Sequence, residues 1–283
     1  MSAVEALLAR AIDYAGLFPP AALDLETTVR NYANYRSGPD MWALGRLVLP
    51  AGKIAEFADR WPQYVEWPIS LLLGSDHDIE MRLAVDVGLR LDAVECRPAN
   101  LEDIAEIRRR MPSDGELFVE SPSGCAPQEV IAAVGDARAC AKLRMGGVVA
   151  EAIPSSDLVA AWLTMCARKR VRLKATAGLH HAICGEQRLT YELQSATTCM
   201  HGFVNVFLAA TAAYQGDDEA AVSELLSDED HRDFDASESA LLWRGRGFST
   251  EEIAEMRRDF LAGFGSCSFG EPMEELRSMG WLE

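Results

Sequence analysis

Two lysines stand in consecutive strand-like segments near the middle of the chain. Lys142 lies in CAKLRM and Lys174 lies in VRLKATA. An unprotonated lysine amine is a nucleophile for carbonyl compounds. Two ammonium groups close together lower the pKa of one of them, because each positive charge disfavours the other. The pair therefore predicts a free amine near neutral pH.

Further charges are predicted to face the same interior. Side chains alternate along a strand, so the apolar residues beside the lysines, such as Leu143 and Leu173, assign the charged ones to the opposite face. By this alternation the inward residues are Glu95, Arg97, Glu120, Lys142, Arg144, Lys174 and Thr176. Unpaired charges in a barrel interior cost several kcal/mol each, so pairing or a bound ligand must compensate them. A purely structural salt-bridge network of these acids and bases is the alternative to a functional site.

Two small, polar loops are candidates for holding an anion. The first is AGLHH at 177–181, which contains Gly178, and the second is GSCSFG at 265–270, which contains Ser266 and Ser268. Backbone N–H groups can approach an anion closely where no Cβ intervenes. The segment EPMEELRSM after the second loop adds a helix N-terminus. The alternative is that the glycines only permit tight turns.

The histidines form one cluster in the sequence. His180 and His181 are adjacent, and His201 and Asn205 have the spacing of one helix face. Adjacent residues of an extended chain point in opposite directions, so one of the pair is predicted to enter the pocket as a general acid or base. A metal site would need that histidine together with His201 and Glu120, without a recognised spacing motif. Histidines that bind no ligand remain the alternative.

The seven cysteines show no CxxC pair and no zinc-finger spacing. They are interpreted as reduced thiols, without disulfides or a structural metal. Cys267 is the one placed on a predicted active-site strand. The alternation that faces Ser266 and Ser268 inward turns Cys267 outward, and no basic neighbour is evident to activate it.

The elements that would position these residues are eight strand–helix units. Predicted strands span 13–18, 46–50, 69–73, 93–97, 117–121, 140–145, 171–177 and 264–269. Repeated units of this kind predict a single (β/α)8 TIM barrel over residues 1–283. The alternative is an open doubly wound sheet, which the absence of a GxGxxG turn weakens. The seventh unit is expanded, with a predicted helical insertion at about 188–262 as a lid or an oligomer contact.

Composition limits the partners. The net charge of -17 argues against a nucleic-acid surface, although a pocket can still be locally positive and attract a small anionic substrate. The N-terminus does not resemble a signal peptide, and no apolar run reaches the length of a membrane helix. The cytoplasm is therefore the expected compartment. No cofactor motif is present, and assembly as a homo-oligomer is left open.

The segments KLRMGG and VRLKATAGLHH resemble class I aldolases of the deoxyribose-phosphate aldolase kind. The resemblance covers these two segments. It implies that Lys142 forms a Schiff base and that Lys174 tunes it. The chain departs from the family in having Leu143, Arg144 and Met145 where the family's turn is rich in Ser and Thr. The family's fourth-strand acid corresponds to Asp92, whereas strand alternation favours Glu95.

The sequence thus predicts an enzyme acting on a small phosphorylated or carboxylated carbonyl compound by lyase or isomerase chemistry. Glu120 or Glu95 would carry protons, and Arg144, His180 and the two loops would hold the anion. A metal-dependent hydrolase or isomerase is the first alternative. A barrel without catalytic activity that binds a ligand or a partner is the second.

Overall fold

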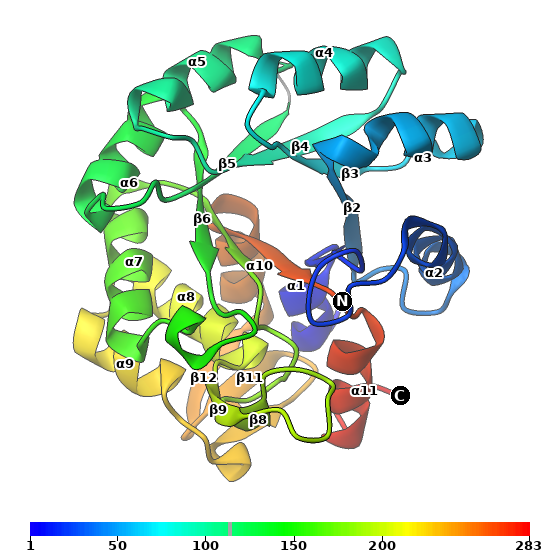
Figure 1. The fold of residues 1–283 in the computed structure, drawn as a ribbon. Coiled ribbons are helices and arrows are strands. Elements are labelled where there is room, and N and C mark those ends of the chain that lie inside the picture. The colour runs from blue at the N-terminus through cyan, green and yellow to red at the C-terminus, as the bar shows by residue number, and fades with distance from the viewer. Residues whose placement is uncertain (113–114) are drawn as a thin grey trace.

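The computed structural model describes residues 1–112 and 115–283 and contains a closed eight-stranded parallel barrel. Around the barrel the strands follow the order β1-β13-β7-β6-β5-β4-β3-β2, with helices on the outside (Figure 1). The barrel strands are β1 (Ile12–Tyr14), β2 (Leu44–Pro50), β3 (Ile69–Leu72), β4 (Leu91–Cys96), β5 (Glu116–Glu120), β6 (Cys140–Arg144), β7 (Leu173–Thr176) and β13 (Leu261–Ser266). The predicted (β/α)8 fold is confirmed, and the open sheet is excluded.

Helices follow or flank the strands around the barrel. They are α1 (Ala3–Leu8), α2 (Leu25–Ser37), α3 (Ile54–Arg60), α4 (His77–Asp86), α5 (Glu102–Arg110), α6 (Pro127–Asp136), α7 (Ser156–Lys169), α8 (Phe203–Gln215), α9 (Glu219–Leu226), α10 (Thr250–Asp259) and α11 (Gly270–Ser278). Side chains cap two of these helices: Ser155 caps α7, and Ser249 with Glu252 forms a capping box on α10. Within the described ranges, no helix combines the length and apolar character that crossing a membrane requires.

The first and last barrel strands lie earlier in the chain than the sequence predicted. The last strand ends at Ser266, not at Phe269, because Gly263 belongs to the strand. A Cβ on Gly263 would lie 2.3 Å from the carbonyl oxygen of Ala11, so only glycine allows the strand to approach the segment that leads into β1.

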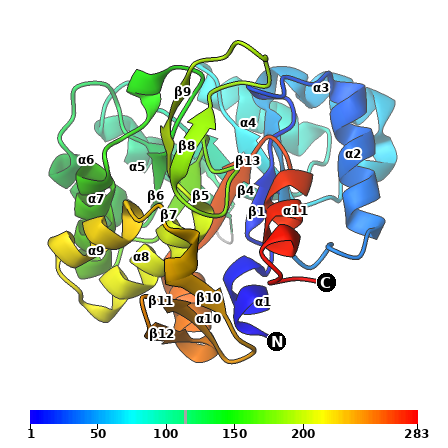
Figure 2. The same ribbon diagram turned by 90° about the horizontal axis from the view of Figure 1, so that it is seen from below.

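The expanded seventh unit contains more than helices. After β7 come the antiparallel hairpin of β8 (Gly185–Arg188) and β9 (Thr197–Met200), then α8 and α9. A three-stranded sheet of β10 (Phe234–Ala236), β11 (Ala240–Trp243) and β12 (Arg246–Ser249) precedes α10. Figure 2 shows these two small sheets outside the barrel. Helix α8 fastens the unit to the barrel, because Phe203 stacks on Phe264 of β13 at 5.5 Å between ring centroids.

Candidate active site

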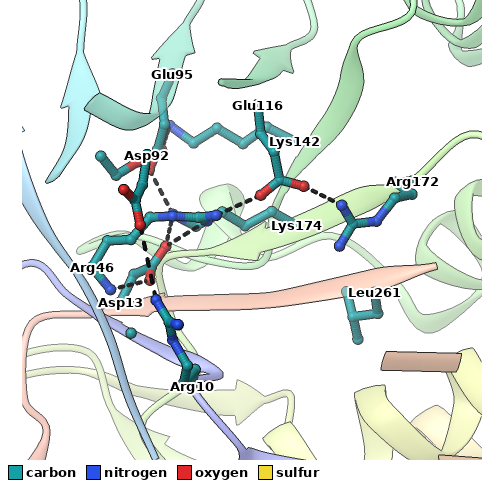
Figure 3. A network of polar contacts seen from close by, with 12 residues as sticks. Arg10, Asp13, Arg46, Asp92, Glu95, Glu116, Lys142, Arg172, Lys174 and Leu261 are labelled. Atoms are coloured by element: carbon teal, nitrogen blue, oxygen red, sulfur yellow. Dashed lines mark hydrogen bonds and ion pairs between the residues drawn. The ribbon is translucent and has the colours of Figure 1, made fainter. Parts of the chain in front are cut away.

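The two lysines lie side by side in the barrel interior. Lys142 of β6 and Lys174 of β7 are register partners, and 5% and 1% of their side-chain surfaces are exposed. Lys174 Nζ donates to Asp13 Oδ2 at 2.5 Å and to Glu95 Oε1 at 2.6 Å (Figure 3). Both of its carboxylate partners are buried. Lys174 is therefore held by ion pairs on two sides.

Lys142 occupies the next position along this chain of charges. Its Nζ lies 2.9 Å from Glu95 Oε2 and 3.5 Å from Glu120 Oε2. Glu95 thus bridges the two lysines through its two oxygens, and Ser70 donates a further hydrogen bond of 2.6 Å to Glu95 Oε1. Glu120 lies nearer the surface, where Arg144 Nε donates to it at 3.1 Å. Each lysine is thus paired with two carboxylates.

These contacts shift the pKa values of Glu95, Glu120 and Lys174. Burial alone would raise the pKa of Glu95, but the charges of Lys142 and Lys174 outweigh it and hold the pKa below its ordinary value. The pKa of Glu120 is likewise lowered against its burial, by Lys142 and Arg144. Burial would lower the pKa of Lys174, but Asp13 and Glu95 raise it. Lys174 is therefore held as an ammonium at neutral pH, and attraction to carboxylates outweighs the repulsion between lysines on which the sequence prediction rested.

The ion pairs continue toward the amino ends of the strands. Arg46 of β2 lies 3.8 Å from Asp13 Oδ2 and 2.5 Å from Glu116, which also pairs with Arg172 (Figure 3). Asp92, the alternative fourth-strand acid, belongs to this lower region, where it pairs with Arg90 at 2.9 Å. It lies apart from the lysines, so Glu95 is the acid of the fourth strand that contacts them.

Two adjoining cavities open above the lysines. The inner one has a volume of about 260 Å³ and is lined by Ala15, Phe18, Pro19, Val48, Leu72, Glu95, Lys142, Arg144, Gly147, Val148, Lys174, Thr176, Ala177, His180, Gly265 and Cys267. The outer one, of about 540 Å³, includes Gly178, His181, Tyr191, Glu271 and residues of the β8–β9 hairpin. Both are lined by Pro19, Gly147, Ala177 and His180. A small molecule could therefore reach Lys142 past His180.

His180 and Cys267 meet at the junction of the cavities. Both ring nitrogens of His180 lie 3.9 Å from Cys267 Sγ, and Nδ1 lies 3.3 Å from Glu271. The prediction that Cys267 faces outward without a basic neighbour is wrong. Strand β13 ends at Ser266, so strand alternation does not extend to the next residue. Ser266 itself is buried, with its Oγ 3.4 Å from His180 Nδ1.

We expect His180 to stay protonated at neutral pH. Burial alone would lower its pKa, but Cys267 and Glu271 raise the pKa of His180 to about 9. Following the ring protons by NMR during a pH titration measures this value directly. Glu271→Gln should move the pKa toward the ordinary value of about 6.5. Glu275→Gln is the matched control, because Glu275 contacts His181 instead; a wild-type midpoint near 6.5 would contradict the assignment.

The loop after β7 depends on a close glycine pair. Ala177 has φ 60° and Gly178 has φ 73°, both in the left-handed region. A Cβ on Gly178 would lie 2.8 Å from Gly146 Cα in the loop after β6. The absence of a side chain thus lets the two loops pack together beside the cavities.

Gly178→Ala should destabilise the protein by about 1–3 kcal/mol, because it adds a backbone clash to an unfavourable φ. Urea denaturation measures the change. Gly245→Ala is the control: Gly245 has φ 79°, but a Cβ there meets no heavy atom within 4 Å. Equal losses in the two variants would show that φ alone matters and that the contact between the loops contributes nothing.

Several predicted site residues lie elsewhere. His201 precedes α8, and its Nε2 donates to the carbonyl oxygen of Pro154 at 2.8 Å, while burial lowers its pKa. Asn205 is buried and binds the backbone, accepting from Cys184 N and donating to the carbonyls of Leu225 and Asp228. Ser268 accepts from the backbone N–H of Glu271 at the start of α11. The prediction that these three residues bind substrate is not supported by these contacts.

Three other predicted residues border the site. Thr176 lines the inner cavity. His181 lines the outer cavity, with Nδ1 2.5 Å from Glu275. Arg97 is exposed beyond the end of β4, where it donates to Ser123 and lies 3.9 Å from Glu120. It was predicted to face inward, but β4 ends at Cys96, so the alternation stops before it.

The predicted metal ligands are not assembled in the part of the chain that the structure describes. His180 contacts Glu271, His201 contacts a backbone carbonyl, and Glu120 pairs with Lys142 and Arg144. Their donor atoms do not form a cluster that could hold an ion. This geometry gives no support to the metal-dependent alternative.

Two residues that contact Lys174 or Glu95 were not among the predicted site residues: Asp13 and Ser70. Strand alternation indicates that both face inward, because Asp13 lies between Ile12 and Tyr14, and Ser70 lies between Ile69 and Leu71.

Comparisons with protein-family models, with curated proteins and with solved structures find no match to this chain. The chemistry of the site must therefore be argued from its geometry.

Proposed function

We propose that this protein is an enzyme of the class I aldolase type, a lyase that forms a Schiff base between Lys142 and a small anionic carbonyl compound. The observation that carries the proposal is the position of Lys142. Its amine lines a cavity of about 260 Å³ at the carboxyl ends of the barrel strands, between two ionised carboxylates. This end of a TIM barrel is where such enzymes place their chemistry.

Lys142 is a better nucleophile candidate than its neighbour. Lys174 is 1% exposed, and its raised pKa and its two short ion pairs hold its proton. The Nζ of Lys142 lies farther from its two carboxylates, at 2.9 Å from Glu95 and 3.5 Å from Glu120, so its ammonium proton is less firmly held and can pass to Glu120. The neutral amine can then attack the carbonyl carbon. Lys174 acts through Glu95, whose ionised state it maintains.

Glu120 is the proposed proton carrier. Glu95 is fixed by both lysines and Ser70, whereas Glu120 lies at the edge of the network with 11% of its side chain exposed. Glu120 would return the proton taken from Lys142 to the carbinolamine hydroxyl, which leaves as water and gives an iminium ion. The iminium ion accepts the electron pair of the breaking carbon–carbon bond, and Glu120, ionised again, would accept the proton of the substrate hydroxyl. Transfer of that proton to the enamine and hydrolysis by water would release the second product and the free amine.

The substrate's anionic group would bind above Lys142. Protonated His180 and the guanidinium of Arg144 line the inner cavity, and Arg188 of the β8–β9 hairpin lines the outer one. Gly178 brings its backbone close to the same space. These groups suit a carboxylate or a phosphate attached to a short carbon chain.

Reductive trapping tests the proposal. The protein is incubated with small aldehydes, ketones and sugar phosphates, reduced with sodium borohydride and analysed by intact and peptide mass spectrometry. The sequence contains four lysines, Lys53, Lys142, Lys169 and Lys174, so an adduct can be assigned to one of them. We expect the adduct on Lys142, and an adduct on Lys174 would reverse the roles assigned to the two lysines.

The absence of an adduct with every compound would overturn the Schiff-base mechanism. A ligand-binding barrel without catalysis would then be favoured. Exposed Lys169 provides an internal control, because modification there at the same level would show that the reaction is not specific to the site.

A further inference from the structure

A second group of potential ligands lies outside the barrel, at the base of the β8–β9 hairpin. Cys184 directly precedes β8, and Cys199 belongs to β9. Their Sγ atoms are 3.4 Å apart, and Cys199 Sγ lies 3.4 Å from Glu229 Oε1. The ligand atoms of the three residues all lie within 4.8 Å of one another.

These distances suit a tetrahedral metal ion. Bonds of about 2.3 Å to thiolate and about 2.0–2.2 Å to carboxylate place neighbouring ligand atoms of a tetrahedral ion roughly 3.5–3.8 Å apart. The distances of 3.4 Å between the two sulfurs and of 3.4 Å between Cys199 Sγ and Glu229 Oε1 are within about 0.4 Å of this spacing. Thiolates favour Zn²⁺ and similar soft cations over Mg²⁺ or Ca²⁺.

A buried side chain fixes the segments that carry the ligands. Asn205, on α8, is fully buried and accepts a 2.9 Å hydrogen bond from the backbone N–H of Cys184. It donates bonds of 2.9 Å to the carbonyls of Leu225 and Asp228. One amide therefore ties the residue before the hairpin to the segment that leads to Glu229. Such support behind the ligands is typical of metal sites.

The surroundings also favour a cation. Glu229 Oε1 lies 3.4 Å from Cys199 Sγ, and Glu186 is the register partner of Cys199 in the hairpin. A divalent cation would offset the negative charge of these carboxylates and of the thiolates.

We infer that Cys184, Cys199 and Glu229 form a binding site for a thiolate-preferring divalent cation such as Zn²⁺, with a fourth position for water. On binding, the two thiols lose their protons to the solvent and two metal–sulfur bonds form, with no change of oxidation state. The hairpin contributes Glu186, Gln187 and Arg188 to the outer cavity. The ion would therefore fasten one wall of that cavity to the segment after α9.

Titration of the reduced, metal-stripped protein with Co²⁺ tests the site. Binding of one ion should produce sulfur-to-cobalt charge-transfer absorption and the strong visible bands of tetrahedral Co²⁺, and Zn²⁺ should displace it. Cys199→Ser and Glu229→Gln should each weaken binding by about a hundredfold or more. Cys125→Ser, at a half-buried thiol between β5 and α6, is the matched control and should bind like the wild type.

Two results would overturn the inference. One is a wild-type protein that shows no charge-transfer band, and the other is a Cys199→Ser variant that keeps the wild-type spectrum and affinity. Alkylation gives a second readout independent of the spectrum. Zn²⁺ should protect Cys184 and Cys199 from iodoacetamide without protecting Cys125, and equal labelling with and without the ion would also contradict the site.

Discussion

Lys142→Ala is expected to abolish borohydride trapping and to lower turnover of any substrate found by trapping by roughly a thousandfold or more, because the nucleophile is lost. The fold should remain, since each acid that contacts Lys142 keeps another partner. Glu95 retains Lys174 and Ser70, and Glu120 retains Arg144. Peptide mass spectrometry after reduction and circular dichroism measure the two effects separately.

Lys142→Arg controls for the charge. It keeps a cation beside both carboxylates but is not expected to form a Schiff base. It should therefore be folded and inactive, even if the alanine variant is unfolded. Lys169→Ala should behave like the wild type. If Lys142→Ala unfolds while Lys142→Arg retains full activity, the lysine has a structural salt-bridge role and the proposed mechanism fails.

The sequence predicted the barrel because its signals are local. Short apolar segments alternate with helical ones, and cap residues such as Ser155 and Ser249 mark helix starts. The small sheets of the seventh unit were not predicted. Strand β8, for example, has the sequence GEQR and lacks the apolar alternation of a half-buried strand. Its pairing with β9 is set by the hairpin and by contacts with other parts of the chain.

The inward-facing charges were predictable, but their pairing was not. Alternation identifies Glu95, Lys142 and Lys174, yet the contact of Lys174 with Asp13 depends on how the barrel closes. Strand β13 lies between β1 and β7 and places Gly265 level with Asp13. Closure of this kind is not encoded in any short segment.

The positions of His201, Asn205 and Cys267 differ from the predicted ones because the predicted ends of their helix and strand were displaced. His201 and Asn205 have helical spacing, but α8 begins only at Phe203, after Gly202. A Cβ on Gly202 would lie 2.4 Å from the carbonyl oxygen of Ala182, so the chain packs closely there and the helix cannot be extended backward through this contact. The same error of two or three residues at the end of β13 reversed the predicted orientation of Cys267.

Lys174→Met should be the most destabilising single change in the site, at about 3–5 kcal/mol at neutral pH, because two buried carboxylates lose their closest cation at once. Of the cations in the described residues, Asp13 then keeps only Arg46, at 3.8 Å, and Glu95 keeps only Lys142, at 2.9 Å. Asp13 and Glu95 are 4% and 2% exposed. Arg144→Met is the matched control. It also removes a cation from an ion pair, but its side chain is 49% exposed, so the loss should stay below about 1 kcal/mol.

The loss of stability caused by Lys174→Met should be smaller at acidic pH than at neutral pH. The pKa of Glu95 is lowered in the folded protein, so its ion pairs stabilise the fold above the unfolded-state pKa of about 4.3, and this contribution is lost as the pH falls below it. The pKa of Lys174 is raised in the folded protein, so the stability contributed by its ion pairs is complete below the unfolded-state pKa of about 10.4. This stability is lost only as the pH rises through the pKa of Lys174 in the folded protein. Urea unfolding of both variants and the wild type between about pH 3 and about pH 8 should therefore show the Lys174→Met deficit shrinking in acid. A deficit that stays constant across this range would mean that the lysine contributes packing and not charge, and the ion-pair account of the site would fail.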